Sequence, residues 1–509
     1  MRIARFIGGL LIGLIALALA AALFVYWFGY ATDMAEASGL GALGYAFLWL
    51  AFGANLLLWT AIGLVRLGED SVRAVLRSPR SGRRGAVGGK ARERVLVGAG
   101  GPGGGTALAE RDGDASEGGA SAVAAAQAAG SEQGGASLAV IIPAHNEEPV
   151  IGGAIASAMG LFDRWDIYVV SDSSRDSTAQ IAAKTGVNVL ELLTNRGKAG
   201  AIEAVLEEFS LTDNYDGVLI LDADTALDPG YVEGARRQLA DPSVAAVAGF
   251  VVSEWKPEER GFVGRMISAY RDRLYFMLQY LMRFGQTWRH ANTAFIVPGF
   301  ASVYRSEALR EIEVNPKGLV IEDFNMTFEV HHKRLGRVSM NPDTKAYSQD
   351  PFTFRDYYKQ VTRWTLGFWQ TVRRHRVWPS LFWACLALYI LEVVLVSAVL
   401  LITAVVGLFV LAGTLGGEFF LSLPFAGEAF TAVTAFLPLL AIAIGLFIPD
   451  YMLTCLMAAI RRRPSYLVYG LLFFPIRLVD AYLALRMIPK AWTTESDGRW
   501  SSPDRVSGR

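Results

Sequence analysis

Hydrophobic residues are distributed along this chain in two ways. Long apolar stretches lie near both ends, and short apolar runs alternate with helical patterns in the middle. Five stretches are at least as long as a bilayer-crossing helix needs to be: 6–30, 40–65, 378–412, 429–460 and 466–488. The first is too long for the core of a cleaved signal peptide. The pattern therefore predicts two N-terminal spans and about three C-terminal spans or interfacial helices.

The last apolar stretch differs from the others because it carries charge. It contains Arg477, Asp480 and Arg486, so it is either a third span or a helix lying in the membrane interface. Arg477 and Asp480 are three residues apart, a spacing at which helical side chains are neighbours. We expect these two residues to pair with each other.

The middle of the chain predicts an α/β domain. Short apolar runs typical of buried strands occupy 138–143, 167–171, 187–192 and 218–221, and helical patterns lie between them at 148–159, 177–185 and 198–209. Such alternation is typical of βαβ units and a largely parallel sheet. Ligands of these sheets bind beyond the carboxyl ends of the strands, and the polar motifs of this chain follow those ends.

Composition and charge divide the chain into five parts. The Gly/Ala-rich region 68–137 cannot bury enough apolar surface to fold and is interpreted as a disordered linker. It separates an N-terminal hairpin (1–67) from the α/β domain (138–376), which C-terminal helices (377–490) and a polar tail (491–509) follow. Arginines follow the apolar stretches ending at Val65 and Ile460, which predicts a cytoplasmic α/β domain.

Overall composition narrows the protein class. The chain is 52% hydrophobic and only 19% charged, which indicates a multi-pass protein of the cell membrane carrying a polar domain. Basic and acidic residues balance at 48 each, so no basic field predicts nucleic-acid binding. Cys385 and Cys455 both lie in apolar stretches, which argues against a disulfide framework or a cysteine metal site.

An Asp-x-Asp motif follows the strand predicted at 218–221. Asp222 and Asp224 are two residues apart, and side chains at that spacing share a face of an extended chain. Two carboxylates suit Mg²⁺ or Mn²⁺ bridging a diphosphate. The alternative is an ordinary turn, in which aspartate is common because it bonds its own backbone.

Four further polar clusters occur in the chain: 140–148 (VIIPAHNEE), 169–178 (VVSDSSRDST), 195–199 (NRGKA), and Glu322-Asp323 followed by 360–364 (QVTRW). Together with the Asp-x-Asp, and in this order, they resemble the processive family 2 glycosyltransferases, which include cellulose, hyaluronan, chitin and poly-N-acetylglucosamine synthases. The resemblance covers about 138–376 and the plan of flanking spans. It implies a nucleotide-diphosphosugar transferase (GT-A) fold inserted between transmembrane helices.

The resemblance also implies roles for particular residues. Glu322 and Asp323 match the catalytic pair, with Asp323 as general base, and Asp222 and Asp224 match the metal-binding aspartates. The residues matching the donor and nucleotide site are Pro143, Ala144, Asn146, Glu147, Asp172, Lys198 and Asp222. The residues matching the acceptor and diphosphate site are Gln360, Arg363 and Trp364. Ser171 stands where many relatives have a second aspartate. His331-His332 is assigned a surface role, because adjacent histidines point apart on a helix.

These correspondences imply an inverting β-glycosyltransferase that uses Mg²⁺ or Mn²⁺ and extends a polysaccharide. UDP-N-acetylglucosamine is the first expected donor and UDP-glucose the second. The expected partners are the UDP-sugar, a growing polysaccharide or lipid acceptor, membrane lipids and an accessory export protein. Two alternatives stay open: transfer of a single sugar to a membrane lipid, and an inactive nucleotide-sugar domain in a membrane assembly or transport component.

Overall fold

The computed structural model describes residues 2–37, 53–77, 135–436, 439–496 and 498 of the 509-residue chain. The N-terminal helices are α1 (Arg2–Ala37) and α3 (Ala54–Arg77). Most of the predicted linker, and the first part of the span predicted at 40–65, lie outside the described residues. The five-part division of the chain therefore stays a prediction.

A seven-stranded sheet forms the centre of the α/β domain. Its strands are β1 (Leu138–Ala144), β2 (Ile167–Asp172), β3 (Asn188–Leu192), β4 (Gly217–Leu221), β6 (Val244–Val247), β8 (Ala301–Arg305) and β9 (Arg337–Ser339). The order is β3-β2-β1-β4-β8-β6-β9, and β3, β2, β1 and β4 are parallel. The predicted α/β fold class is confirmed. β8 runs antiparallel to β4 and β6, which the short apolar runs do not reveal.

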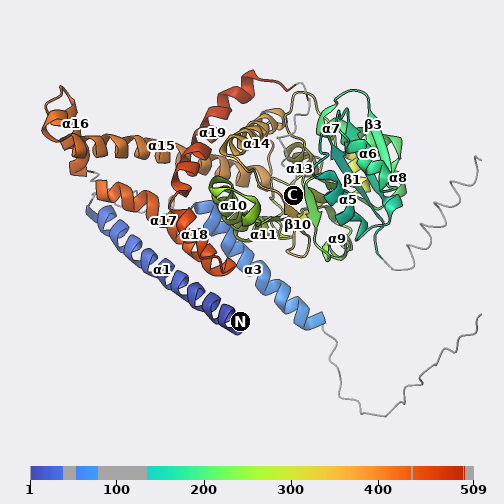
Figure 1. Ribbon diagram of the computed structural model, residues 1–509, viewed down its shortest axis with the longest axis horizontal. Coiled ribbons are helices and arrows are strands. Elements are labelled where there is room, and N and C mark those ends of the chain that lie inside the picture. Colours follow the sequence, from blue (N-terminus) through green and yellow to red (C-terminus); the bar gives the residue numbers. More distant parts are fainter. Residues whose placement is uncertain (1, 38–52, 78–134, 437–438, 497, 499–509) are drawn as a thin grey trace, which may run out of the picture. The chain divides into compact units, whose positions relative to one another are not determined.

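Helices cover both faces of this sheet (Figure 1). One face packs against α5 (Ile151–Met159), α6 (Thr178–Lys184) and α9 (Tyr231–Leu239). The other packs against α7 (Gly197–Glu208), α8 (Leu211–Asn214), α12 (Ser306–Glu311) and α13 (Asp323–His332). Alternate residues of β1 enter the two cores, as expected for a strand buried on both faces.

A smaller sheet and three short helical segments complete the strand-containing region. Its strands are β5 (Thr225–Leu227), β10 (Lys345–Ser348) and β7 (Phe250–Ser253), in the order β5-β10-β7. The short segments are η1 (Arg164–Asp166), η2 (Pro257–Glu259) and α11 (Phe284–Gln286). β5 begins directly after the Asp-x-Asp motif, so this sheet fixes the far end of that turn.

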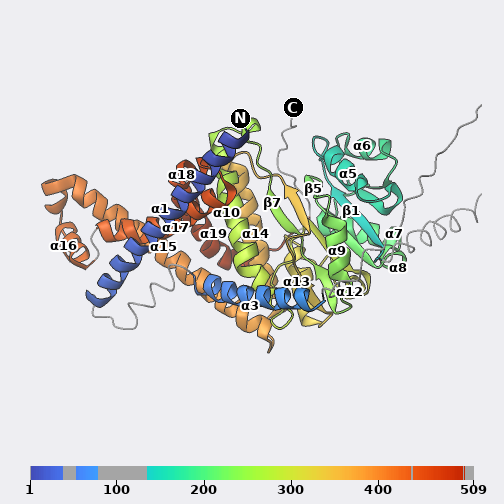
Figure 2. The same ribbon diagram turned by 90° about the horizontal axis from the view of Figure 1, so that it is seen from below.

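Two long helices run beside each other next to the sheets (Figure 2). They are α10 (Phe262–Phe276), which continues as the π-helix η3 (Met277–Arg283), and α14 (Phe354–His375). α14 also packs against α19 (Phe473–Thr493). The helix that carries the Gln-x-x-Arg-Trp motif therefore lies between α10 and a C-terminal helix.

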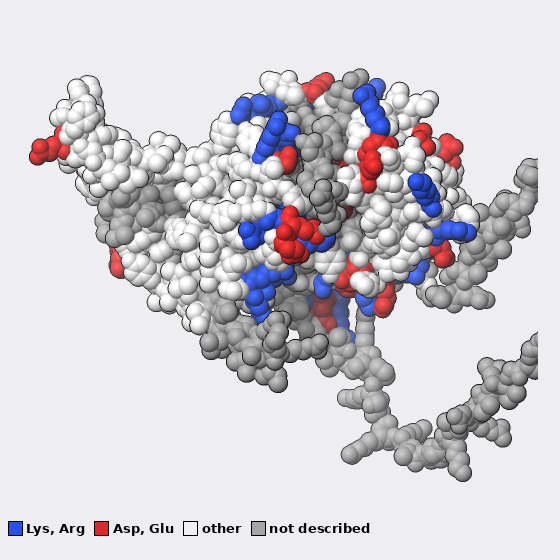
Figure 3. All heavy atoms as spheres, viewed as in Figure 1, with Lys and Arg blue, Asp and Glu red and all other residues white. Residues whose placement is uncertain are grey.

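The remaining C-terminal helices are α15 (Leu381–Leu421), α16 (Ala426–Phe436), α17 (Leu439–Arg461) and α18 (Ser465–Gly470). Within the described part of the chain, α15 alone is long and apolar enough to cross a membrane. Leucine, isoleucine and valine side chains are exposed along it, and its surface is almost uncharged where it faces the viewer in Figure 3. The multi-pass arrangement stays a prediction.

Two expectations about charged and histidine residues are wrong. Arg477 pairs with Asp450 at 3.0 Å, while Asp480 accepts hydrogen bonds from Tyr270 and Tyr357, each at 2.7 Å. The surface role predicted for His331-His332 is wrong for His331, whose ring stacks on Phe382 and whose Nε2 lies 2.8 Å from the Ala294 carbonyl oxygen, whereas His332 is exposed. For Arg477 and Asp480, partners far along the chain replace the expected local pair.

Candidate active site

Asp172 ends β2 and holds the loop in front of α7. Its Oδ1 accepts a hydrogen bond from the Arg196 N–H at 2.7 Å, and its Oδ2 accepts one from the Gly197 N–H at 2.8 Å. Burial raises the pKa of Asp172, and these two N–H groups oppose the rise. The loop is thereby fixed so that Lys198 starts the helix at the carboxyl ends of the strands.

The turn after β1 is tied to the turn after β2. Pro143 and Ala144 are buried at the end of β1, and Glu147 is buried in the turn that follows. Asn146 adopts a positive φ of 55° and accepts a hydrogen bond from the Arg175 N–H at 2.8 Å. The predicted nucleotide-binding residues of β1 and β2 therefore lie at one edge of the sheet.

The Asp-x-Asp motif lies in a turn and not on a strand. β4 ends at Leu221, and the Thr225 N–H donates to the Asp222 carbonyl oxygen at 3.0 Å before β5 begins. The alternating-face rule for extended chains therefore does not apply to Asp222 and Asp224, whose placement comes from the turn. The Asp222 N–H also donates to the Phe300 carbonyl oxygen at 2.8 Å.

Lys198 joins the end of β4 to the start of α13. Its Nζ lies 2.7 Å from Asp222 Oδ1 and 3.0 Å from Glu322 Oε1, and it donates to the Gly299 carbonyl oxygen at 2.9 Å. Burial raises the pKa of Asp222, which Lys198 partly offsets. Burial also opposes ionisation of Glu322, but Lys198 outweighs it and lowers the pKa of that carboxyl.

Asp323 is the first residue of α13, directly beside this cluster. Its Oδ1 accepts from the Phe324 N–H at 2.7 Å, and its Oδ2 accepts from the Gly299 N–H at 3.3 Å. Burial, reinforced by the charge of Glu322, raises the pKa of Asp323 to about 6, against the opposing effect of Lys198. A carboxylate with a pKa near neutrality is suited to general-base chemistry.

The three residues of the acceptor motif lie on α14. Gln360 and Trp364 are partly buried, whereas Arg363 is exposed. The charge of Arg363 nevertheless contributes to lowering the pKa of Glu322. The motif and the Glu322-Asp323 pair, distant in sequence, are thus brought within electrostatic reach of each other.

The sequence predictions missed Arg271 and Tyr275 of α10. Arg271 is 3% exposed; its Nη1 donates to Gln360 Oε1 at 2.7 Å and its Cζ lies 4.6 Å from the centre of the Trp364 ring. Its Nε lies 3.3 Å from Asp350 Oδ1. The Tyr275 hydroxyl accepts a hydrogen bond from Arg271 Nη2, and the negative charge of Asp224 contributes to raising the pKa of Tyr275, which burial raises most. An arginine and a tyrosine four residues apart, and so on one face of a helix, were the available signal.

The residues present fit a divalent cation that is held jointly with a substrate. No group of three acidic, histidine or cysteine ligands occurs among the described residues. Asp222 and Asp224 offer two carboxylates, and Asp222 is about one-third exposed. Mg²⁺ is commonly bound by one or two carboxylates together with substrate phosphates. The donor set matches that mode of binding.

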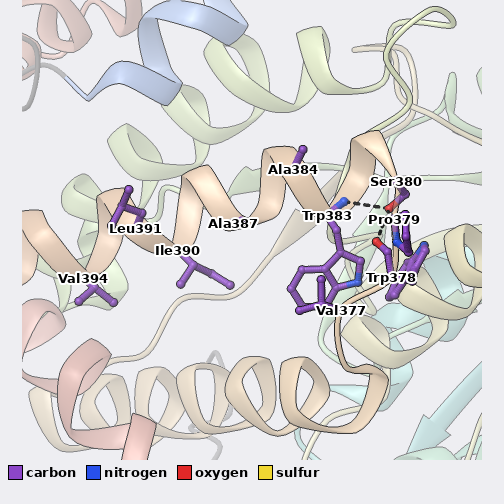
Figure 4. A pocket seen from close by; sticks show the side chains of 10 residues that line it. All are labelled: Val377, Trp378, Pro379, Ser380, Trp383, Ala384, Ala387, Ile390, Leu391 and Val394. Carbon is purple, nitrogen blue, oxygen red and sulfur yellow. Dashed lines mark hydrogen bonds between the residues drawn. The ribbon is translucent and has the colours of Figure 1, made fainter.

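A groove of about 610 Å³ lies outside this cluster, beside the first turns of α15. Figure 4 shows Trp378 and Trp383 at one end and Ile390, Leu391 and Val394 along the helix. Its lining contains no acid, base or cysteine. Ser380 supplies the one side-chain hydroxyl of an otherwise apolar and aromatic lining.

Comparison with known proteins identifies a family domain in part of the chain. The model of glycosyl transferase family group 2 matches residues 217–461. The poly-β-1,6-N-acetyl-D-glucosamine synthase of Staphylococcus epidermidis (strain ATCC 35984) is 23% identical over 386 residues, covering 72% of this chain and 86% of that protein. The synthase of Staphylococcus aureus (strain COL) is 25% identical over 237 residues, covering 45% and 53%.

Among solved structures, a mannosyltransferase from Pyrobaculum calidifontis in complex with GDP-Man and Mn²⁺ is 18% identical with a TM-score of 0.42, covering 69% of this chain and 96% of that chain. Glucosyl-3-phosphoglycerate synthase from Mycobacterium tuberculosis, in complex with Mn²⁺, UDP and phosphoglyceric acid, is 17% identical with a TM-score of 0.32, covering 53% and 86%. From the family match and the curated relatives, this chain contains a family 2 glycosyltransferase domain.

Proposed function

We propose that this protein transfers a sugar from a UDP-linked donor to the end of a growing β-linked polysaccharide, with inversion at the anomeric carbon. The observation that carries the proposal is the convergence of Lys198, Asp222 and Asp323 at the carboxyl end of β4. The relatives named poly-β-1,6-N-acetyl-D-glucosamine synthase support N-acetylglucosamine as the first donor sugar. Glucose is the second.

In this proposal Asp323 accepts the proton of the attacking hydroxyl. As the acceptor oxygen bonds to the anomeric carbon, the bond from that carbon to the β-phosphate oxygen breaks. The electron pair leaves with UDP, and the proton passes to the Asp323 carboxylate. A single in-line displacement of this kind inverts the anomeric configuration. Glu322 keeps the pKa of Asp323 raised through its negative charge.

The leaving diphosphate requires positive charge, which Lys198 and Arg363 supply in this scheme. Mg²⁺ or Mn²⁺ bound by Asp222 and Asp224 would neutralise charge on the diphosphate. The turn residues Pro143, Ala144, Asn146 and Glu147, together with Asp172, are proposed to form the nucleoside end of the donor site. Trp364 offers a ring face for the acceptor sugar, and Gln360 a polar contact beside it.

The proposed setting is the cell membrane, with several spans and the catalytic domain on the cytoplasmic side. The exposed apolar surface of α15 supports contact with lipid. The polymer would leave through the adjacent helices, with an accessory protein assisting export.

The test is UDP release by the purified protein in detergent. UDP-N-acetylglucosamine, UDP-glucose and UDP-glucuronate would each be supplied with Mg²⁺ or Mn²⁺, and the products sized. We expect release with one donor, a long saccharide, and loss of both in Asp323→Asn but not in Glu307→Gln, an exposed carboxylate at the start of α12. A product limited to singly glycosylated lipid would indicate a non-processive enzyme, and the absence of both UDP binding and UDP release would indicate an inactive domain.

A further inference from the structure

Four polar side chains recur at every fourth position along α10 and η3: Arg271, Tyr275, Gln279 and Arg283. In the π-helix η3 the hydrogen bonds span one residue more than in an α-helix, so a four-residue spacing stays on one face there. We call these four residues the polar stripe. π-helical turns inside α-helices are frequent at functional sites, and this one occupies the half of the stripe that ends in Arg283.

The first three members of the polar stripe have partners within the protein. Arg271 and Tyr275 contact each other, and Arg271 also holds Gln360. Gln279 accepts a hydrogen bond from the Val251 N–H at 2.6 Å and donates to the Val251 carbonyl oxygen at 2.9 Å. These contacts explain why three polar side chains are buried on this face.

Arg283, the fourth member, lacks such a partner. It is 8% exposed, and within the described part of the chain its buried Nη1 has no hydrogen-bond acceptor. A buried cation without a hydrogen-bonded partner is costly. Burial lowers the pKa of Arg283 to about 10, and the charge of Asp323 only partly opposes this. The guanidinium can therefore donate a hydrogen bond to a ligand that supplies oxygen acceptors.

The surroundings of Arg283 match a saccharide better than the diphosphate. Its titratable neighbours include Asp323 and the phenols of Tyr275 and Tyr389, whereas the diphosphate end of the site is the Lys198–Asp222 pair. The Tyr389 ring lies 4.5 Å from that of Phe295, which adds aromatic surface. Aromatic faces beside hydrogen-bond donors suit sugar rings, whose apolar faces stack while their substituents bond.

A second buried donor lies close by along the chain fold. Gly285, two residues after Arg283, approaches α3 so closely that a Cβ there would lie 2.3 Å from the Trp59 carbonyl oxygen. Trp59 is 2% exposed, and its Nε1 has no acceptor among the described residues. Arg283 Nη1 and Trp59 Nε1 are therefore two buried donors without acceptors among the described residues, on segments that are in contact at Gly285.

We propose that Arg283 is an acceptor-binding residue, whose guanidinium donates hydrogen bonds to hydroxyl or acetamido oxygens of the saccharide that presents its hydroxyl to Asp323. The inference rests on the proposed glycosyltransferase reaction and adds the residue that holds the acceptor on the α15 side of the base. Arg283 orients the acceptor and takes no part in proton transfer.

The experiment compares Arg283→Met and Arg283→Lys with Arg265→Met in the full-length protein in detergent. Arg265 is a partly buried arginine on the same helix, outside the polar stripe. UDP release is titrated with a β-1,6-linked N-acetylglucosamine oligosaccharide at fixed UDP-N-acetylglucosamine. UDP binding with Mn²⁺ and the thermal midpoint are measured in parallel.

We expect Arg283→Met to raise the acceptor KM about tenfold or more, with a smaller fall in kcat and an unchanged Kd for UDP. Arg283→Lys should recover part of the loss, and Arg265→Met should match the parent. Provided that the parent enzyme is active, an unchanged acceptor KM in Arg283→Met overturns the inference. A weakened UDP affinity in that variant overturns it as well. Should the Met variant unfold, a parent-like KM in the Lys variant overturns it. If the parent enzyme shows no turnover, the proposed function itself is contradicted.

Discussion

Asp323 combines a helix-start position with a charged neighbourhood that keeps its proton affinity high. Burial and Glu322 raise its pKa to about 6, while Lys198 and the Gly299 N–H oppose them. A group that must be ionised to accept a proton becomes inactive as the pH falls through its pKa. The activity should therefore fall as the pH drops below about 6, and it should stay constant at higher pH.

The pH profile of kcat/KM for UDP release measures this directly, because it reports groups of the free enzyme. Above the pKa of Asp323, Asp323→Asn should lower the rate by about 10²–10⁴-fold, and the difference should shrink as the pH falls and the parent base is protonated. A rate that stays constant from about pH 5 to about pH 8 would show that Asp323 is not the titrating base.

Asp222 and Asp224 lead to a prediction about how the metal binds. With two carboxylates and no third ligand among the described acidic, histidine and cysteine residues, the site should hold the cation firmly only when a diphosphate completes the coordination. Mn²⁺ with UDP should therefore raise the thermal midpoint, while either alone has little effect. Asp224→Asn should remove the joint shift; a full shift with Mn²⁺ alone would contradict the two-carboxylate site.

Arg271 shows how one buried guanidinium organises a motif. It bonds Gln360 and stacks on Trp364 while paired with Asp350. Lysine keeps the charge but lacks the planar fork, so Arg271→Lys should lower kcat/KM for the acceptor by about tenfold or more and leave the UDP Kd unchanged.

A matched control for Arg271 is available in the same neighbourhood. Arg260 donates to the carbonyl oxygens of Asp350 and Pro351 and stacks on Phe352, and within the described part of the chain these contacts do not involve Gln360, Arg363 or Trp364. Arg260→Lys should lower the thermal midpoint with little change in the acceptor KM. If Arg271→Lys and Arg260→Lys changed the acceptor KM equally, Arg271 would have a structural role only.

At the scale of elements, α10, α14 and α19 are joined through one carboxylate. Asp480 of α19 accepts hydrogen bonds from Tyr270 of α10 and Tyr357 of α14, each at 2.7 Å. Removing one hydroxyl leaves the other, whereas removing both leaves a half-buried carboxylate without either donor. The three helices should therefore lose stability cooperatively.

The prediction is a double-mutant cycle. Tyr270→Phe and Tyr357→Phe should each lower the free energy of unfolding by about 1 kcal/mol, and the double variant by more than their sum. Unfolding in detergent, followed by tryptophan fluorescence, measures it, with Tyr358→Phe, also on α14, as the control. Simple additivity would mean that the two hydroxyls act independently.

At the scale of the whole molecule, exposed apolar surface and buried charge are separated. α15 exposes aliphatic side chains along its length, while the charged pairs of α17 and α19, such as Asp450 with Arg273 at 2.9 Å, are buried against α10. Inward-facing charges and an apolar exterior are expected of helices in contact with lipid.

The protein should therefore remain in the membrane fraction after washing with alkaline carbonate or high salt, and detergent should release it. A peripheral protein held by charge would be released by salt. Recovery of the full-length chain in the carbonate supernatant would contradict insertion of α15.

The sequence by itself determined the local elements of the α/β domain. The four predicted strands agree with β1 to β4 within one residue at each end, because strands buried on both faces need continuous apolar runs. The Asp-x-Asp motif was visible for a related reason, since polar residues that interrupt such runs mark the strand ends where ligands bind. Both signals depend on neighbours in sequence.

Only the tertiary structure decided which side chains meet. Lys198 contacts the carbonyl of Gly299, 101 residues away, and Arg271 contacts Gln360 across 89 residues. Asp480 was expected to pair with Arg477, but it accepts hydrogen bonds from two tyrosines of other helices. Periodicity records which face of an element is buried, but it contains no information about the element packed against that face. The acid–base and guanidinium contacts of this site therefore follow from packing.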